Sequence, residues 1–385
     1  MTTKDFTKLF EAIPHDVLIG IGEDTGIDKN VSRLYGDRML KLLLLTMLRS
    51  NKPSTRIMEM LYESPFFNAF SGKGGHKTRH SSLASRLSTM NPDYFRQVFE
   101  WVLAKHGSKL KTSKLFQRIR SYDSTMVSIS SALVDWGMRV GRPPKDKRQE
   151  VQLKFTMSMY GKVPSSVKAH FNQSYLSEEK ALKEAILASD LAPGDFVVFD
   201  RGMRSRSSFK LFDEQNIQFV TKASKNVRYQ ELETYRNIKG RQADDLEFVK
   251  DVKVHLYQEG HDILKHEFRL VVAKDLKTNR TLCFITNAWE PSAMDIARIY
   301  RRRWDIEVFF RFLKQQMNVK HLLNRSESGV QIQMYCALIL AILLLVFKKK
   351  GKISSYKAAK LLFEEYLLMV LANQLEKPPK KLITS

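Results

Sequence analysis

One carboxylate, Glu307, has cations and an aromatic ring at helical spacings on either side of it. An α-helix turns about 100° per residue, so a helix over this segment would gather on one face Tyr300, Arg303, Glu307, Arg311 and Lys314. A carboxylate can ligate a divalent metal ion, and the cations around it can hold phosphate groups. The stripe therefore predicts chemistry on nucleic acid.

Two aspartates stand in segments with the pattern of β-strands. Asp123 lies in the run 119–129, where alternate positions differ in character and β-branched residues are frequent. Asp200 follows the apolar run Phe196–Phe199, which a helix-like segment precedes. This is typical of a parallel strand covered on both faces, and ligands of such sheets gather at the carboxyl ends of the strands. A helix cap or a loop carboxylate is the simpler reading of Asp200 taken alone.

Taken together, the three acids suit metal-dependent phosphoryl transfer. Asp123, Asp200 and Glu307 come from three different elements. Two aspartates and one glutamate can hold a pair of Mg²⁺ ions about 3.5–4 Å apart, which stabilise the attacking and the leaving oxygens. We expect Mg²⁺ as the cofactor, with Mn²⁺ able to substitute, and no covalent link between protein and DNA. The three acids are the predicted catalytic and metal-binding residues.

Periodicity indicates the elements that must position these acids. Strand-like runs are followed by a helix and two more strands, at 119–129, 151–159, 163–171, 177–189, 196–199 and 219–221. The segment between Asp200 and Glu307 is too long for a simple connection. It contains alternating runs at 247–256, 263–273 and 281–286. These runs predict further strands between the second and the third acid.

The N-terminal part has the periodicity of helices. Gly36–Ser50 is strongly apolar and is expected to form the centre of a helical unit. A second helix follows, and the glycine-rich basic loop Ser71–His80 joins it to a third at 81–87. Two short helices with a basic connection can contact DNA, and ordinary helix packing is the alternative. Basic residues without an acid at 105–120 place a domain boundary near residue 115.

Composition agrees with a nucleic-acid partner. The 385 residues include 64 Lys and Arg against 41 Asp and Glu, a net charge of +23, and such a balance favours polyanions. An anionic membrane surface, or charge for solubility alone, is the alternative. The apolar run Met334–Phe347 is shorter than the about 20 residues that span a bilayer, so we expect a core helix and no membrane. Two cysteines and the lack of a signal peptide favour a reducing, cytoplasmic location.

These motifs resemble those of bacterial insertion sequence transposases of the insertion sequence 4 group. The Tyr-Arg-Glu-Lys signature of that group is similar, at all four positions and at the family spacing, to Tyr300, Arg303, Glu307 and Lys314. The segments Tyr122–Thr125 and Phe199–Gly202 resemble its first and second acid motifs, the Asp-Asp part of an Asp-Asp-Glu triad. The resemblance spans roughly residues 116–345.

The resemblance implies a fold, a set of domains and an activity. The fold would be an α/β ribonuclease-H-like catalytic core with a β-rich insertion, preceded by an α-helical N-terminal domain. The expected domains are a DNA-end-binding domain at 1–115, the first part of the core at 116–223, the β-rich insertion at 224–287, the second part of the core at 288–347 and a helical tail at 348–385. The implied activity is metal-dependent strand cleavage and strand transfer in cut-and-paste transposition.

The implied partner is double-stranded DNA, both the terminal inverted repeats and the target, bound by a homodimer that pairs two ends. Residue by residue, the resemblance implies DNA contacts at Tyr300, Arg303 and Lys314. Neighbouring cations are further candidates for DNA binding, namely Arg301, Arg311 and Arg201. The protein would act in the bacterial cytoplasm, associated with the nucleoid when it is bound to DNA.

Two other functions fit parts of the sequence. A ribonuclease-H-like structure-selective nuclease would not need the helical domain or the insertion, and a non-catalytic DNA-binding protein derived from a transposase would not need the three acids. The loop Gly141–Arg148 has the composition of a minor-groove hook, and an exposed loop explains it as well. Asp305 lies about 200° around a helix from Glu307, so we expect a surface or ion-paired role. The C-terminal apolar segment either mediates dimerisation or caps the core.

Overall fold

The computed structural model describes residues 13–71, 77–107, 118–130, 137–139, 150–258, 262–317 and 321–375. The predictions for the loop Gly141–Arg148 and for residues 72–76 of the basic loop lie outside these ranges. The chain forms two compact units. One comprises 1–110 together with 310–385, and the other comprises 111–309.

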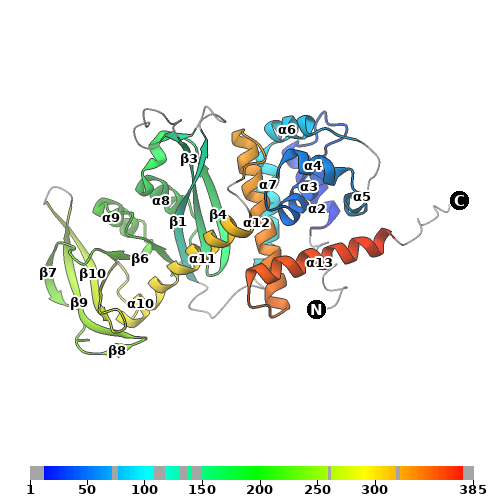
Figure 1. Cartoon of the computed structure of the whole chain (residues 1–385). Helices are drawn as coiled ribbons and strands as arrows, with labels where there is room; N and C mark the ends of the chain where they lie inside the picture. The colour runs from blue at the N-terminus through cyan, green and yellow to red at the C-terminus, as the bar shows by residue number, and fades with distance from the viewer. Residues whose placement is uncertain are drawn as a thin grey trace. The chain divides into compact units, whose positions relative to one another are not determined.

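The unit formed by 111–309 is built on one mixed sheet (Figure 1). The strands of its first half are β1 (Ile119–Ser130), β2 (Met138–Arg139), β3 (Glu150–Tyr160), β4 (Val163–His170), β5 (Phe196–Phe199) and β6 (Gln218–Ala223). Those of its second half are β7 (Tyr229–Thr234), β8 (Gln242–Ala243), β9 (Leu246–Tyr257), β10 (Ile263–Asp275) and β11 (Thr281–Thr286). The order along the sheet is β2-β3-β1-β5-β6-β11-β10-β9-β7, with β4 also paired to β3 and β8 to β9.

Three parallel strands form the middle of this sheet. β1 pairs with β5 from Ile119 opposite Phe196, and β5 pairs with β6 up to Phe199 opposite Thr221. β3 runs antiparallel to β1 along nearly the whole of β1. Because β1 continues well past its pairing with β5, Asp123 lies beyond the last paired residue and Asp200 follows the end of β5. The two predicted catalytic aspartates therefore belong to the same carboxyl edge of the sheet.

Helices cover both faces of the sheet, and alternate strand residues face each layer. α8 (Glu178–Leu187) and α9 (Arg206–Glu214) share a core with Tyr122, Val197 and Phe219. α10 (Ala293–Arg301) shares another core with Val198 and Val220. The residues of β5 divide between these two cores, which explains why Phe196–Phe199 is apolar without alternation. A short 3-10 helix, η3 (Gln173–Leu176), precedes α8.

The predicted insertion forms strands, and these strands extend the same sheet. β9, β10 and β11 lie where alternation predicts strands, whereas β7 and β8 were not predicted. β11 pairs antiparallel with β6 over four residues, Val220–Ala223. Inside the insertion, Arg269 of β10 and Asp251 of β9 form a fully buried ion pair, with both side chains 0% exposed. The insertion is thus joined to the core strands by main-chain hydrogen bonds.

The other unit is wholly helical in its described residues. It contains α2 (His15–Thr25), α3 (Gly36–Arg49), α4 (Thr55–Tyr62), α5 (Pro65–Ser71), α6 (His80–Thr89), α7 (Pro92–His106), α12 (Glu327–Lys350) and α13 (Tyr356–Leu375). α3 confirms the helix expected at Gly36–Ser50. The side chain of Asn91 caps the N-terminus of α7, and Pro92 is the first residue of the helix. Helix packing thus accounts for the apolar stripes in this part of the sequence.

α12 is the central helix of this unit. It packs against α3, α6, α7 and α13, and nearly all of its side chains from Val330 to Phe347 are buried. Among the described residues α12 alone is long and apolar enough to cross a bilayer, and 89% of its most apolar window is buried inside the protein. This burial agrees with the core helix expected at Met334–Phe347. A helix that is apolar on all sides must be surrounded, and the N-terminal helices supply the surrounding faces.

The two compact units differ from the sequence-based domains in the second half of the chain. The sequence-based division places 288–347 in the catalytic core and 348–385 in a separate tail, whereas 310–385 as a whole clusters with the N-terminal helices. Phe363 of α13, which lies in the predicted tail, packs edge-on against Phe347 of α12, with 5.3 Å between ring centroids. The Lys360 ammonium of α13 donates to the Gln316 carbonyl at 2.8 Å. α13 therefore contributes to the core of the helical unit.

Candidate active site

Asp123 is held near the middle of β1 in a largely buried setting. Its side chain is 15% exposed, and its Oδ1 accepts a hydrogen bond from the Ser124 backbone N–H at 2.7 Å. Burial raises the pKa of the carboxyl to about 7, against the opposing effects of the Ser124 hydrogen bond and the Arg303 charge. The negative charges of Glu178 and Asp200 add to the rise. A carboxyl that titrates near neutrality is typical of functional sites.

Asp200 stands directly after β5, where the strand gives way to a turn. Its Oδ1 accepts from the Arg201 backbone N–H at 2.7 Å and from the Tyr300 hydroxyl at 3.3 Å. The Thr221 hydroxyl donates to the Phe199 carbonyl at 3.0 Å and so fixes the end of the strand. Burial raises the pKa of Tyr300, which keeps its hydroxyl protonated as a donor. Tyr300 and Asp200 are therefore direct partners.

The helix expected over Tyr300–Lys314 is two helices, so this expectation was wrong. α10 ends at Arg301 and α11 (Arg303–Gln316) begins two residues later, with Arg302 between them. The Arg302 carbonyl accepts from the Ser121 hydroxyl of β1 at 3.2 Å and from the Asp305 backbone N–H at 3.0 Å. A bond from the sheet thus pins the break beside the strand that carries Asp123. Asp305 pairs with Arg302 at 3.5 Å, as expected of an ion-paired residue.

Arg303 is the group on which the acids converge, despite the helix break. Its Nη1 lies 3.8 Å from Asp123 Oδ2, and its Nη2 donates to Glu307 Oε1 one turn along α11. The guanidinium also lies 5.9 Å from the centroid of the Tyr300 ring, and the charge of Asp200 acts on it. The site thus contains three carboxylates from β1, the end of β5 and α11, with one guanidinium among them.

The donor set fits a divalent cation, but the spacing in this structure does not yet form a metal cage. Carboxylate oxygens are the ligands that Mg²⁺ prefers. Within the ranges that the structure describes, no three Asp, Glu, His or Cys side chains are close enough together to hold one ion. Arg303 pairs with Asp123 and Glu307 at the same time.

Glu178 is a fourth carboxylate at this edge that sequence reasoning missed. It begins α8, and Ser177 caps the helix. Its carboxylate lies against Gly202, where an added Cβ would stand 2.6 Å from Glu178 Oε2. Burial raises its pKa, Lys154 lowers it, and the charge of Asp200 raises it further. A first-turn glutamate looks like an ordinary helix acid, so only Gly202 in the Asp200 motif hints at the close approach.

Glu178→Gln is expected to lower the pKa of Asp123 below its value of about 7, because the substitution removes a negative charge that raises it. Carbon-detected NMR titration of the Asp123 carboxyl measures this directly. Glu179→Gln is the matched control, since Glu179 is the next residue of α8 and its Oε1 accepts from Ser208 at 3.2 Å. An unchanged Asp123 titration in Glu178→Gln would contradict the coupling.

The other predicted DNA-binding cations have different surroundings. Arg201 is exposed beside Asp200. Arg301 donates from Nη2 to the Asp244 carbonyl at 3.0 Å, which joins α10 to the turn before β9. Arg311 and Lys314 lie further along α11, in residues that belong to the helical unit. Of the predicted set, Tyr300, Arg303 and Arg201 are thus the members placed at the acids.

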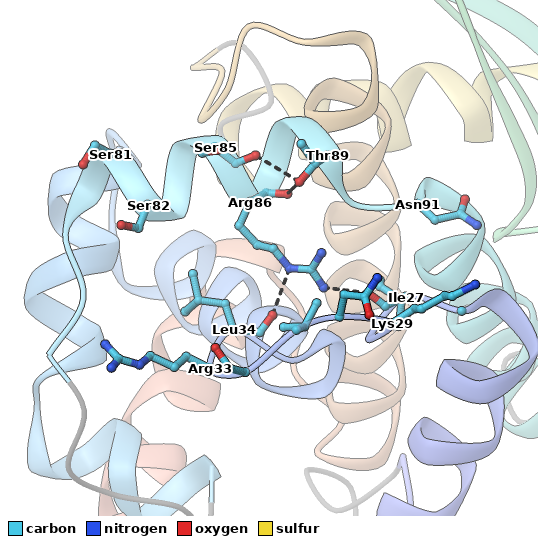
Figure 2. A pocket seen from close by; sticks show the side chains of 14 residues that line it. Ile27, Lys29, Arg33, Leu34, Ser81, Ser82, Ser85, Arg86, Thr89 and Asn91 are labelled. Atoms are coloured by element: carbon cyan, nitrogen blue, oxygen red, sulfur yellow. Dashed lines mark hydrogen bonds between the residues drawn. The ribbon is translucent and has the colours of Figure 1, made fainter.

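In the helical unit a polar cleft of about 830 Å³ lies between α6 and the loop that follows α2 (Figure 2). Arg86 ties the two walls together, donating from Nε to the Leu34 carbonyl at 3.0 Å and from Nη2 to the Ile27 carbonyl at 2.8 Å. The other polar residues that line the cleft supply hydroxyls, amides and two further cations, namely Lys29, Asn30, Ser32, Arg33, Ser81, Ser82, Ser85, Thr89 and Asn91. No acid is among the lining residues. Such donors suit a phosphate backbone.

Comparison with known proteins identifies the family. The transposase DDE domain matches residues 114–344. The chain is 27% identical to a putative transposase of Sinorhizobium fredii over 42% of this chain and 45% of that protein. It is 24% identical to a probable transposase for insertion sequence element IS5377 of Geobacillus stearothermophilus, over 69% and 66% of the two chains. It is 26% identical to a putative transposase for element IS4SA of Synechocystis, over 67% and 69%.

The matched regions span between 45% and 69% of the lengths of these relatives. Among solved structures, a piggyBac transposase in a synaptic complex with hairpin DNA has a TM-score of 0.44 and 13% identity, over 98% of this chain and 83% of that one. The domain match covers more than half of the chain and contains Asp123, Asp200 and Glu307. The chain belongs to the transposase DDE domain family.

Proposed function

We propose that the protein is a DNA transposase that cuts and rejoins the ends of an insertion sequence by Mg²⁺-dependent phosphoryl transfer. The observation that carries this is the convergence on Arg303 of acids from β1, from the end of β5 and from α11, inside the matched domain. The strand order β4-β3-β1-β5-β6, with β3 antiparallel between β4 and β1, supports a ribonuclease-H-like core. The β-rich insertion lies between the second and third acids.

The three acids would serve as the metal ligands. Asp123, Asp200 and Glu307 would hold the ions, which, when bound, activate the attacking hydroxyl and neutralise the leaving oxygen. Arg303 balances the charge of these carboxylates in the present arrangement. It must therefore release at least one of them when the site is loaded. The released guanidinium would be next to the scissile phosphate, where it can hold the non-bridging oxygens.

Tyr300 positions the substrate in this proposal. Its hydroxyl stays protonated because burial raises its pKa, so it can donate to a phosphate oxygen as it now donates to Asp200. Neither a serine nor a tyrosine nucleophile is needed, because water or a DNA 3′-hydroxyl attacks the phosphorus. The same displacement at phosphorus would then occur twice with different nucleophiles. Water would hydrolyse the strand at the element end, and the freed 3′-hydroxyl would attack the target.

The helical unit would bind the ends of the element. The cleft in Figure 2 supports this, because it presents hydroxyl donors together with Lys29 and Arg33. Its third cation, Arg86, pairs with Asp28 at 3.5 Å. Small side chains on the exposed face of α6 allow a phosphate backbone to approach the helix closely. The partners proposed are terminal inverted repeats and target DNA, held by a homodimer in the synaptic complex. The site of action would be the bacterial cytoplasm and nucleoid.

Lys29→Ala/Arg33→Ala is expected to weaken DNA binding. The binding constant should also become less sensitive to salt: the negative slope of its logarithm against the logarithm of the salt concentration should decrease in magnitude by about 2, since each phosphate contact contributes about 0.9. Binding titrations by fluorescence anisotropy across a series of salt concentrations measure the slope. Lys352→Ala/Lys357→Ala removes the same charge from exposed positions of the same unit and is the control. Equal slopes for the two double variants would exclude the cleft as a DNA-binding surface.

The test of the function is cleavage of a labelled fragment that carries the DNA flanking this protein's own reading frame. Nicking at the element boundary that requires Mg²⁺ or Mn²⁺ would support a transposase. Cutting of branched or hybrid substrates without regard to the boundary would support a structure-selective nuclease. Tight binding with no cutting under either metal would support a non-catalytic DNA-binding protein.

A further inference from the structure

A second pocket opens in the sheet unit beside Asp200. Its volume is about 540 Å³. The turn after β5, the end of β6 and the segment leading to β7 form its walls, with Tyr257 of β9 on one side. Five of its lining residues are cations, Arg201, Arg204, Arg206, Lys222 and Arg228. Of these five, only Arg201 was a DNA-binding candidate from the sequence.

Charge is the first argument that this pocket binds an anion. Among the residues that line it, none is an aspartate or a glutamate. Two of its guanidiniums are ordered by stacking, Arg206 at 5.2 Å from the centroid of Phe209 and Arg228 at 5.1 Å from that of Tyr257. Five like charges gathered in one pocket repel one another. A ligand with several negative oxygens would relieve this repulsion.

Position is the second argument. Arg201 follows Asp200 and donates its backbone N–H to the Asp200 carboxylate at 2.7 Å. Phe199 and Thr221 are the last paired residues of β5 and β6, so Asp200 and Lys222 are the residues that follow on adjacent strands. Neighbouring strands lie about 4.7–4.9 Å apart. The pocket thus starts at the second acid of the candidate active site.

We propose that this pocket binds a backbone phosphate of the DNA strand next to the phosphodiester that is cut. The proposal rests on the proposed function, because it takes the three acids as the place of cleavage. A volume of about 540 Å³ lies in the range of sites that hold a single small molecule, and one phosphate with its sugar is within that size. Holding a phosphate beside the reacting one fixes the strand for in-line displacement.

The experiment removes charge from both sides of the contact. The labelled flanking fragment is made with a methylphosphonate at one position at a time around the boundary, and its binding is measured without divalent metal. For the unsubstituted protein, a neutral linkage at the contacted position should weaken binding about tenfold, as the loss of a hydrogen bond to a charged group does. For Arg204→Gln/Arg228→Gln, the same linkage should change binding less than about twofold, because the partner is already missing.

Arg280→Gln is the matched control, since Arg280 is an exposed arginine on the turn between β10 and β11. It should show the same methylphosphonate profile as the unsubstituted protein. Equal sensitivity of the pocket variant at every position would overturn the proposal. Binding of free deoxyadenosine monophosphate that the pocket variant loses, without any positional coupling, would also overturn it and assign the pocket to a diffusible nucleotide.

The readout is an equilibrium, so it separates the pocket from the proposed function. Positional coupling in a protein that never cuts the fragment under Mg²⁺ would retain the pocket as a phosphate-binding site and reject the transposase function. Cutting at the boundary without coupling would retain the function and reject the pocket.

Discussion

Asp123→Asn is expected to lower the rate of Mg²⁺-dependent strand cleavage by about 10³-fold or more, because a metal site supplies several kcal/mol of stabilisation to the transition state and each 1.36 kcal/mol is tenfold in rate. The asparagine keeps the size of the side chain and removes the charge. DNA binding in the helical unit should persist. Single-turnover cleavage of the labelled fragment measures the loss. The control is Asp190→Asn, because Asp190 is an exposed acid of the unit that also contains Asp123.

The same substitution, which should abolish cleavage, is expected to stabilise the folded protein at alkaline pH. Burial raises the pKa of Asp123 from 3.8 to about 7, so the folded state binds more protons than the unfolded state between these values. The contribution of Asp123 to the free energy of unfolding therefore decreases as the pH rises from about 4, and the decrease is complete above about 7. Asp123→Asn should raise the midpoint of thermal unfolding at pH 8, and this gain should shrink towards pH 5.

An inactive Asp123→Asn protein that is also less stable at pH 8 would contradict this reading, since its inactivity could then come from misfolding. Retained cleavage with normal stability would remove Asp123 from the triad. Loss of cleavage together with a gain in stability is the pattern expected of an acid that is kept for chemistry at a cost to the fold.

Arg269→Met is expected to destabilise the sheet unit by about 3–5 kcal/mol, the usual cost of leaving one partner of a buried ion pair alone. Arg269 donates from Nε and Nη2 to the two oxygens of Asp251, each at 2.8 Å. Its Nη1 donates to the carbonyls of Ala288 and Pro291 at 3.1 and 2.7 Å. Denaturant unfolding followed by fluorescence measures the shift.

The double variant Arg269→Met/Asp251→Leu is the informative companion. It removes both charges, so no buried carboxylate is left alone, and it should lose less stability than Arg269→Met. Lys277→Met breaks an exposed pair with Asp245 in the same insertion and should change stability by less than about 1 kcal/mol. If Arg269→Met unfolded at the same denaturant concentration as Lys277→Met, the buried pair would not hold the insertion in place.

Much of the fold could be predicted because burial leaves a period in the sequence. The runs 247–256 and 263–273 match β9 and β10 closely. β10 was found although its central residues, Phe268–Val271, are buried on both faces. β7 was missed because all but its first residue are exposed, so no apolar face marks it. β8 is only two residues long, which is too short for a period.

The parts of the site that sequence could not predict depend on contacts between distant segments. The stripe from Tyr300 to Lys314 has good helical spacing, and the break at Arg302 comes with a hydrogen bond from Ser121 in another element. Glu178 carries no motif, and its approach to the acids depends on how α8 meets the turn at Gly202. The types and order of Asp123, Asp200 and Glu307 were readable, whereas the central place of Arg303 among them was not.

The pairing of β11 with β6 bears on why the insertion cannot simply be trimmed away. Without it, β6 would be the outermost strand of the core, with a row of unpaired backbone N–H and C=O groups. Its sequence, Gln218–Ala223, is largely buried and apolar at Phe219 and Val220. An apolar strand with a free edge is a template for pairing between copies of a chain. We therefore expect the insertion to protect this edge from pairing between copies of the chain, and a shortened protein that kept all three acids to be less soluble.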